Sequence, residues 1–267
     1  MIFAKVFTMI FAIAAIMGIS NNSVYAANDW AVNNYIEVTG QGMAPANARN
    51  ATHGRMLARR AAVADCYRQL AEAVKGVQVE SGTDVEMMML QSDTIRLSVT
   101  TTIRGATVVS EKNLGDGAYE VTMRMSIFGT DNSLAKAVLP SQTTQESFPK
   151  PSQRVTSTGG YTGLIVDCRG LGLKPVMSPV IKNDSGQKIY GYKNLDYDKV
   201  ISQGMANYSY DLKRGVDRAG SNPLVVKAVR VDNHNGDPVI STADANRVLS
   251  ENNVSHFLES TNVVFIR

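Results

Sequence analysis

The sequence predicts an α+β fold, in which an N-terminal antiparallel sheet carries two helices on one face and a second, smaller mixed α/β domain follows. Three observations predict this. Strand-like and helical segments alternate in the first half, a stretch rich in Ser, Thr and Pro interrupts the chain at 140–160, and short strand patterns recur beyond it. The 267 residues, 44% of them hydrophobic, are enough for one large or two small domains with buried cores.

The first 26 residues have the pattern of a signal peptide. Lys5 precedes an apolar run at 6–19, and small residues lead up to Ala26. The run is shorter than the ~20 residues that a membrane-spanning helix needs. We therefore expect cleavage after Ala26 and a periplasmic or secreted protein. No cysteine lies near the cleavage point, so we expect no lipid anchor.

The first domain is expected at 28–139. Alternation predicts a strand at 34–39, and a 3.6-residue period predicts a helix at 52–75 that ends at Gly76. The residues expected on the buried face of this helix are Met56, Val63, Tyr67, Leu70 and Val74.

The rest of this domain continues with a predicted strand at 77–90, in which Met87, Met88 and Met89 are expected to fill the core of the sheet. A second helix is expected from a Ser92 cap to Gly105. Residues 106–111 and 118–128 flank an Asn- and Gly-rich turn, which predicts a hairpin.

Residues 140–160 contain few apolar side chains, so this segment is interpreted as a linker where limited proteolysis should cut first. The second domain is expected at 161–267. Its predicted elements are a strand at 163–166, a glycine-rich corner at 167–172, a hairpin at 180–192, a weak helix at 198–213, a strand at 224–231, a helix that starts at Ser241 or Thr242, and a strand at 262–266.

Several segments resemble the LPP20 lipoprotein family and the N-terminal domain of the flagellar assembly protein T family. They are residues 35–42 (YIEVTGQG), 57–72 (LARRAAVADCYRQLAE), 103–106 (IRGA) and 119–122 (YEVT). Residues 163–179 also resemble a segment often joined to that domain in exported bacterial proteins. The resemblance implies a small α+β envelope domain, with some relatives tied to flagellar assembly and with no established catalytic centre. Unlike those lipoproteins, this chain lacks a lipobox cysteine.

Cys66 and Cys168 are too few for a disulfide scaffold, and they lie in different predicted domains. A bridge needs Cα atoms within about 7 Å of each other, which would dock the two domains together. The alternative is two buried thiols. The resemblance favours this packing role, because relatives often carry a small residue at both positions.

The net charge of +3 is too small for a protein whose main work is to neutralise phosphates, so no nucleic-acid partner is expected. Arginines make the first helix basic: Arg49, Arg55, Arg59, Arg60 and Arg68. We interpret them as a solvated face. Peripheral contact with the membrane, the cell wall or other anionic polymers is the alternative.

Candidate binding residues lie in the second domain. Asp167, Arg169 and Lys174 surround the glycine-rich corner, where they form either a ligand site or a local salt bridge. Tyr190 and Tyr192 belong to a group with Tyr197, Tyr208 and Tyr210 that predicts either an aromatic platform or a packed core. No catalytic set, metal site or cofactor motif is predicted.

These observations favour a non-enzymatic exported protein that supports flagellar or outer-envelope assembly through contacts with envelope or flagellar proteins. Two alternatives stay open, a peptidoglycan- or polysaccharide-binding module and a hydrolase. The sequence does not set an oligomeric state.

Overall fold

A computed structural model describes residues 30–142, 144–153, 155–213 and 216–267. The predicted signal peptide and its cleavage site after Ala26 lie outside the described residues. Within these ranges, no helix combines the length and the apolar character needed to cross a membrane.

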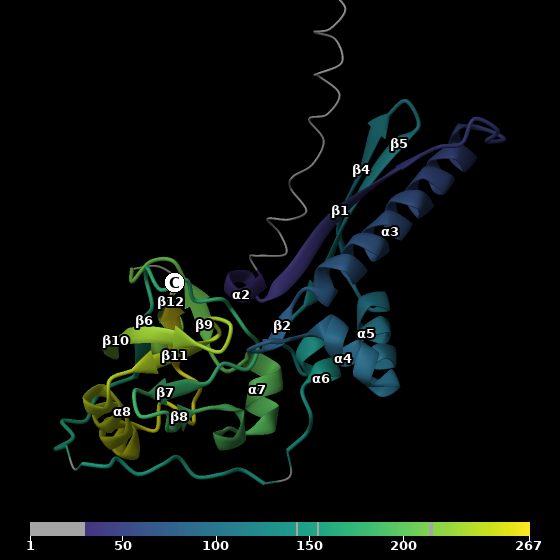
Figure 1. Ribbon diagram of the computed structural model, residues 1–267. Helices are drawn as coiled ribbons and strands as arrows, with labels where there is room; N and C mark the ends of the chain where they lie inside the picture. The colour runs from purple at the N-terminus through teal and green to yellow at the C-terminus, as the bar shows by residue number, and fades with distance from the viewer. Residues whose placement is uncertain (1–29, 143, 154, 214–215) are drawn as a thin grey trace, which may run out of the picture.

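The N-terminal domain is built on a three-stranded antiparallel sheet with the order β1-β5-β4. The strands are β1 (Tyr35–Met43), β4 (Thr107–Gly115) and β5 (Ala118–Ser126), and a tight turn joins the last two. The long helix α3 (Ala51–Lys75) lies along one face of the sheet (Figure 1). The antiparallel sheet, the hairpin and the bounds of the first helix are confirmed.

The predicted buried face of this helix is wrong in part. Met56 is 54% exposed, whereas an i, i+4 row of mostly small residues is buried: Gly54, Ala58, Ala62, Cys66, Leu70 and Val74. The reason lies on β1, where a Cβ at Gly40 or Gly42 would overlap with backbone atoms of α3. Because strand and helix are so close, the row between them must be small.

The strand predicted at 77–90 is wrong beyond Asp84. The chain forms the short strands β2 (Gln78–Glu80) and β3 (Thr83–Asp84) and then the helix α4 (Val85–Gln91). Asp84 caps this helix, since its carboxylate accepts a hydrogen bond from the Met87 amide at 2.8 Å. Met87 is 43% exposed, so the three methionines lie on a helix and do not fill the core of the sheet.

The second predicted helix is confirmed as α5 (Asp93–Arg104), which begins after the Ser92 cap and ends at Gly105. It buries Val99 and Ile103 against its neighbours α3, α4 and α6 (Leu134–Val138). A short helix, α2 (Trp30–Asn33), precedes β1 and contacts the C-terminal sheet.

The C-terminal domain holds a seven-stranded mixed sheet with the order β8-β7-β11-β10-β6-β12-β9. Its strands are β6 (Gly163–Asp167), β7 (Ile181–Asn183), β8 (Lys188–Tyr190), β9 (Asn207–Ser209), β10 (Pro223–Asp232), β11 (Asp237–Ile240) and β12 (Val263–Ile266). The helices are α7 (Tyr197–Gln203) and α8 (Thr242–Ser255), with 3₁₀ turns at Tyr192–Asn194 and Asp217–Ala219.

One helix of this domain is shorter than predicted. The helix expected at 198–213 ends at Gln203, because Gly204 takes a φ of +77° and turns the chain into β9. The predicted strands at 224–231 and 262–266 and the helix that starts after Ser241 are confirmed.

The two domains pack against each other. The amides of Met177 and Ser178 donate to the carbonyls of Gln78 and Val79 at 2.9 and 2.8 Å. Buried apolar side chains form a continuous core that runs through both domains. Residues 140–160, which we call the belt, carry no helix or strand where they are described, and they lie along the C-terminal domain (Figure 1).

Candidate functional site

The glycine-rich corner after β6 holds a local ion pair. Arg169 Nε and Nη2 donate to the two carboxylate oxygens of Asp167 at 2.8 and 2.6 Å. This guanidinium holds the pKa of Asp167 below its usual range. Lys174 is exposed outside this pair, and its backbone amide donates to Asn235. The corner therefore has the geometry of the salt-bridge alternative, because the charges of Asp167 and Arg169 neutralise each other.

Most of the tyrosines in the predicted group pack inside the fold or against the belt. Tyr190 has no exposed surface, and its hydroxyl donates to the Met205 carbonyl at 2.6 Å. The hydroxyl of the half-buried Tyr192 donates to the Pro140 carbonyl in the belt. Tyr208 is buried as well, whereas Tyr210 is exposed and carries the Arg267 guanidinium over its ring. The group does not form one aromatic surface.

Both cysteines are free thiols, one in the core of each domain. Burial raises the pKa of each thiol, and for Cys168 it does so to about 12. Cys66 Sγ lies 3.1 Å from the Val121 carbonyl oxygen, in the narrow space between α3 and β5. These are the properties of packing residues.

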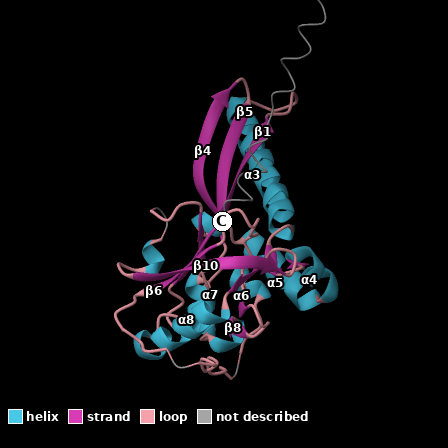
Figure 2. Ribbon diagram, turned by 60° about the vertical axis from the view of Figure 1, so that its left-hand side comes forward, coloured by secondary structure: helices cyan, strands magenta, loops and turns pink. Residues whose placement is uncertain are grey.

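The surface that sequence reasoning missed is an arm formed by β1, β4, β5 and the N-terminal half of α3. In Figures 1 and 2 this arm extends away from the C-terminal domain. The face of its sheet opposite α3 is polar. It carries cross-strand pairs such as Thr39 with Thr122 and Gln41 with Glu120, and Arg124 Nη2 lies 2.7 Å from Glu37 Oε2.

Strand β4 is the most open part of the arm. All nine of its residues are exposed, and within the described chain it pairs with β5 alone. Three of its apolar side chains, Val108, Val109 and Leu114, are each more than 40% exposed. The signal in the sequence was the polar composition of this strand, with Lys112 near its middle, because charged side chains are typical of edge strands.

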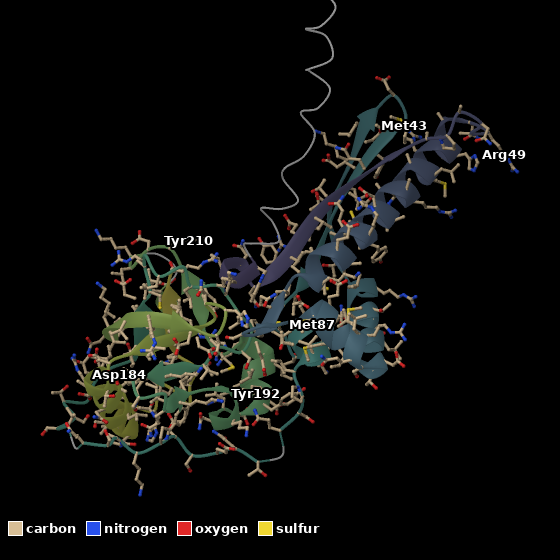
Figure 3. The ribbon with its side chains drawn as sticks, in the orientation of Figure 1. Met43, Arg49, Met87, Asp184, Tyr192 and Tyr210 are labelled. Atoms are coloured by element: carbon tan, nitrogen blue, oxygen red, sulfur yellow. The ribbon has the colours of Figure 1, made fainter. Side chains whose placement is uncertain are left out.

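The far end of the arm is basic and partly apolar. Figure 3 shows Met43 and Arg49 at this end, and Met43 is 63% exposed. Arg59 on α3 pairs with Glu111 on β4 through two hydrogen bonds, one of them 2.8 Å long. The predicted solvated basic face is therefore partly tied to the sheet.

Family comparisons identify the arm-bearing half. Residues 29–126 match the family model described as LPP20 lipoprotein. The N-terminal domain is LPP20-like. The match reaches from just before α2 to the end of β5, so it includes the whole arm.

The other half matches a different description. Residues 163–267 match the model for the second domain of Treponema pallidum Tp0624, and the match starts at the first residue of β6. None of the curated proteins matches the chain. The LPP20 match supports an exported envelope protein.

A buried polar cluster joins the LPP20-like domain to its neighbour. Asp237 is 3% exposed, and its carboxylate accepts hydrogen bonds from Ser81 at 2.7 Å, Lys182 at 2.8 Å and Asn233 at 2.6 Å. Ser81 lies in the turn between β2 and β3, so this bond crosses the domain boundary. We call these four residues the latch. Through Ser81 they connect the base of the arm to the C-terminal domain.

Proposed function

We propose that the protein is a non-enzymatic exported envelope protein that supports envelope or flagellar assembly, and that the β4 edge of its LPP20-like domain is the contact surface. The observation that carries this proposal is the exposure of all nine residues of β4. An edge strand presents unpaired backbone N–H and C=O groups, which an extended segment of another protein can pair with.

The partner that fits this edge is a short extended segment of another exported protein. A register shift between Val108 and Ser110 interrupts the ladder, so the edge is not one regular nine-residue template. Lys112 adds a charge in the middle of the strand, and such charges oppose edge-to-edge pairing between identical copies. The exposed Val109 and Leu114 supply apolar contacts on either side of it.

The test is crosslinking in the living cell. A photo-crosslinking residue placed at Val109 should capture an exported protein, whereas the same residue at Val225 should not. Val225 is the matched control, because it is an exposed valine, 50% accessible, on a strand of the other domain. The substitution Val109→Lys should weaken capture from a neighbouring probe at Leu114. Equal capture from both valines, or adducts of the chain with itself alone, would remove the proposal.

The flagellar and the general envelope versions differ in phenotype. Deletion of the gene should impair envelope integrity, and under the flagellar version it should also impair motility. Normal motility with a leaky envelope would exclude flagellar assembly. The proposed periplasmic or secreted location without a lipid anchor has its own check. Mass spectrometry of the exported protein should give a chain that begins at Ala27 with no added acyl mass.

A further inference from the structure

An apolar groove lies where α3, α4 and α5 meet, away from the β4 edge. Its volume is about 450 Å³, within the range of ~300–1,000 Å³ typical of small-molecule sites. Its lining residues are Tyr67, Ala71, Lys75, Met89, Thr100, Ile103 and Arg104.

The two hydroxyl groups that line the groove are already bonded within the protein. The Tyr67 hydroxyl donates to the Arg104 carbonyl at 3.3 Å, and the Thr100 hydroxyl donates to the Arg96 carbonyl at 2.8 Å. Ala71, Met89 and Ile103 line the groove beside these bonded hydroxyls and supply apolar surface. Such a wall suits a hydrocarbon chain, which has no polar groups to satisfy, better than it suits a peptide backbone.

Two cations stand at the groove, on the last turns of α3 and α5. Lys75 Nζ is 3.1 Å from Glu86 Oε1, so its charge is already paired. The guanidinium of Arg104 makes no ion pair or hydrogen bond with any residue in the described ranges. It is exposed and forms one wall of the groove. One unpaired cation beside an apolar channel is complementary to one anionic head group on a single chain.

We propose that this groove binds the acyl chain of a fatty acid, with its carboxylate at Arg104. The chain lies against Ala71, Met89 and Ile103, and the guanidinium donates charge-assisted hydrogen bonds to the carboxylate. This site is separate from the β4 edge, so it is independent of the proposed docking function.

Calorimetric titration of the mature protein with octanoate, decanoate and dodecanoate, each kept below its micellar concentration, tests the site. We expect one molecule bound per chain. Affinity should rise about fourfold per added methylene, hence about fifteenfold from octanoate to decanoate, until the groove is full. Dodecyltrimethylammonium should bind more weakly than dodecanoate, because its head group repels Arg104.

Variants separate the groove from adventitious binding. Ala71→Trp fills the space and should abolish binding, and Met89→Glu, which puts a carboxylate into the channel, should do the same if the first variant folds poorly. Arg104→Gln should weaken binding about threefold. Arg96→Gln is the matched control on the same helix. Arg96 is paired with Asp93 outside the groove, so this change should leave the affinity unchanged.

Each of the following results would overturn the proposal. They are the absence of saturable binding, equal affinity of the wild type and both groove-filling variants, and equal binding of the cationic and anionic amphiphiles. A groove that binds an amphipathic helical peptide but no fatty acid would also overturn it. Val109→Lys should leave fatty-acid binding unchanged, so a failure here is distinguishable from a failure of the docking proposal.

Discussion

Strands β4 and β12 show how differently the two domains use a strand. All nine residues of β4 are exposed, whereas all four residues of β12 are fully buried. β12 lies between the parallel strands β6 and β9, while β4 ends its sheet. Strand β12 therefore lies inside the core of its sheet, whereas β4 leaves apolar side chains at a rim where another chain can reach them.

The polar contacts follow the same division. The ion pairs of the arm, such as Arg59 with Glu111, are partly exposed and contribute about 0–1 kcal/mol each. In the C-terminal domain, Glu251 is 3% exposed, and its carboxylate accepts hydrogen bonds from Ser157, Thr158 and Gly159 of the belt. Burial makes such contacts costly to lose. The exposed ion pairs of the arm can therefore be lost at little cost in stability, whereas the buried contacts of Glu251 cannot.

The two strands should differ most in how much unfolding free energy the protein loses when one of their side chains is truncated. Phe265→Ala empties a fully buried site beside the Tyr208 ring and should cost about 3–5 kcal/mol of unfolding free energy. Val109→Ala on β4 should change it by less than about 0.5 kcal/mol. Urea unfolding of the mature protein measures both. Similar costs for the two substitutions would contradict the contrast between the strands.

The close contact between α3 and β1 is the next test, because it shows that one part of the arm is tightly packed. Gly42→Ala places a methyl group against the backbone of Ala58 and Ala62 and should destabilise the protein by about 3 kcal/mol.

Gly54→Ala is the matched control. Its new Cβ would lie 3.3 Å from the Ala44 side chain, and alanine favours a helix by about 1 kcal/mol over glycine. We therefore expect this variant to be neutral or slightly more stable. If Gly42→Ala were equally harmless in urea unfolding, the explanation given for the small-residue row on α3 would be wrong.

The hydrogen bonds between Glu251 and the belt contribute a smaller, pH-dependent part of the stability. Burial by itself raises the pKa of Glu251, but the hydrogen bonds from Ser157, Thr158 and Gly159 outweigh it, and the folded-state pKa is lowered. Glu251 therefore stabilises the fold above its unfolded pKa of about 4.3, and this contribution is lost as the pH falls through the lower folded pKa.

Glu251→Gln should lower the free energy of unfolding by about 1–2 kcal/mol at neutral pH. The reason is that the side-chain NH₂ group of the glutamine would face the hydroxyl and amide donors of the belt. It should also flatten the loss of stability below about pH 4.3. Glu86→Gln is the control, because Glu86 forms a half-exposed ion pair with Lys75. This variant should change the stability and its pH dependence little. Unfolding curves at pH 7 and pH 3.5 measure both variants, and an unchanged pH profile in Glu251→Gln would exclude this role.

Local signals were sufficient for much of the fold. The Ser92 cap, the Asn- and Gly-rich hairpin turn and the stop at Gly76 act within a few residues, so their elements could be predicted. The buried face of α3 could not be predicted, because two glycines on another strand select it. Helix α4 was missed because a short apolar run has no distinctive period, and its Asp84 cap was the signal that could have identified it.

The candidate site was less predictable than the fold. The sequence drew attention to Asp167, Arg169 and the tyrosines, because charged and aromatic side chains stand out in a glycine-rich region. Their neutralised or buried state depends on contacts that only the fold defines. The bond between Ser81 and Asp237 joins residues 156 positions apart, and no local pattern indicates such a pair.

Loss of the bond between Ser81 and Asp237 should have the smallest predicted effect on stability. This bond lies where the two domains meet. Ser81→Ala removes a donor to Asp237 but leaves Lys182 and Asn233 in place, so the carboxylate stays paired and the cost should be about 1 kcal/mol. The loss should be local. Hydrogen exchange should speed up at the amides of Met177 and Ser178, which bond to the base of the arm.

Ser185→Ala is the control for this experiment. It removes a hydroxyl of the same kind that donates to Asn183 within a turn of the C-terminal domain, so exchange at the two interface amides should not change. If both variants left these amides protected, the hydrogen bond from Ser81 would not be what holds the arm in place. The packed apolar core that the domains share would then be sufficient to fix the direction of the arm, and with it the position at which β4 meets a partner.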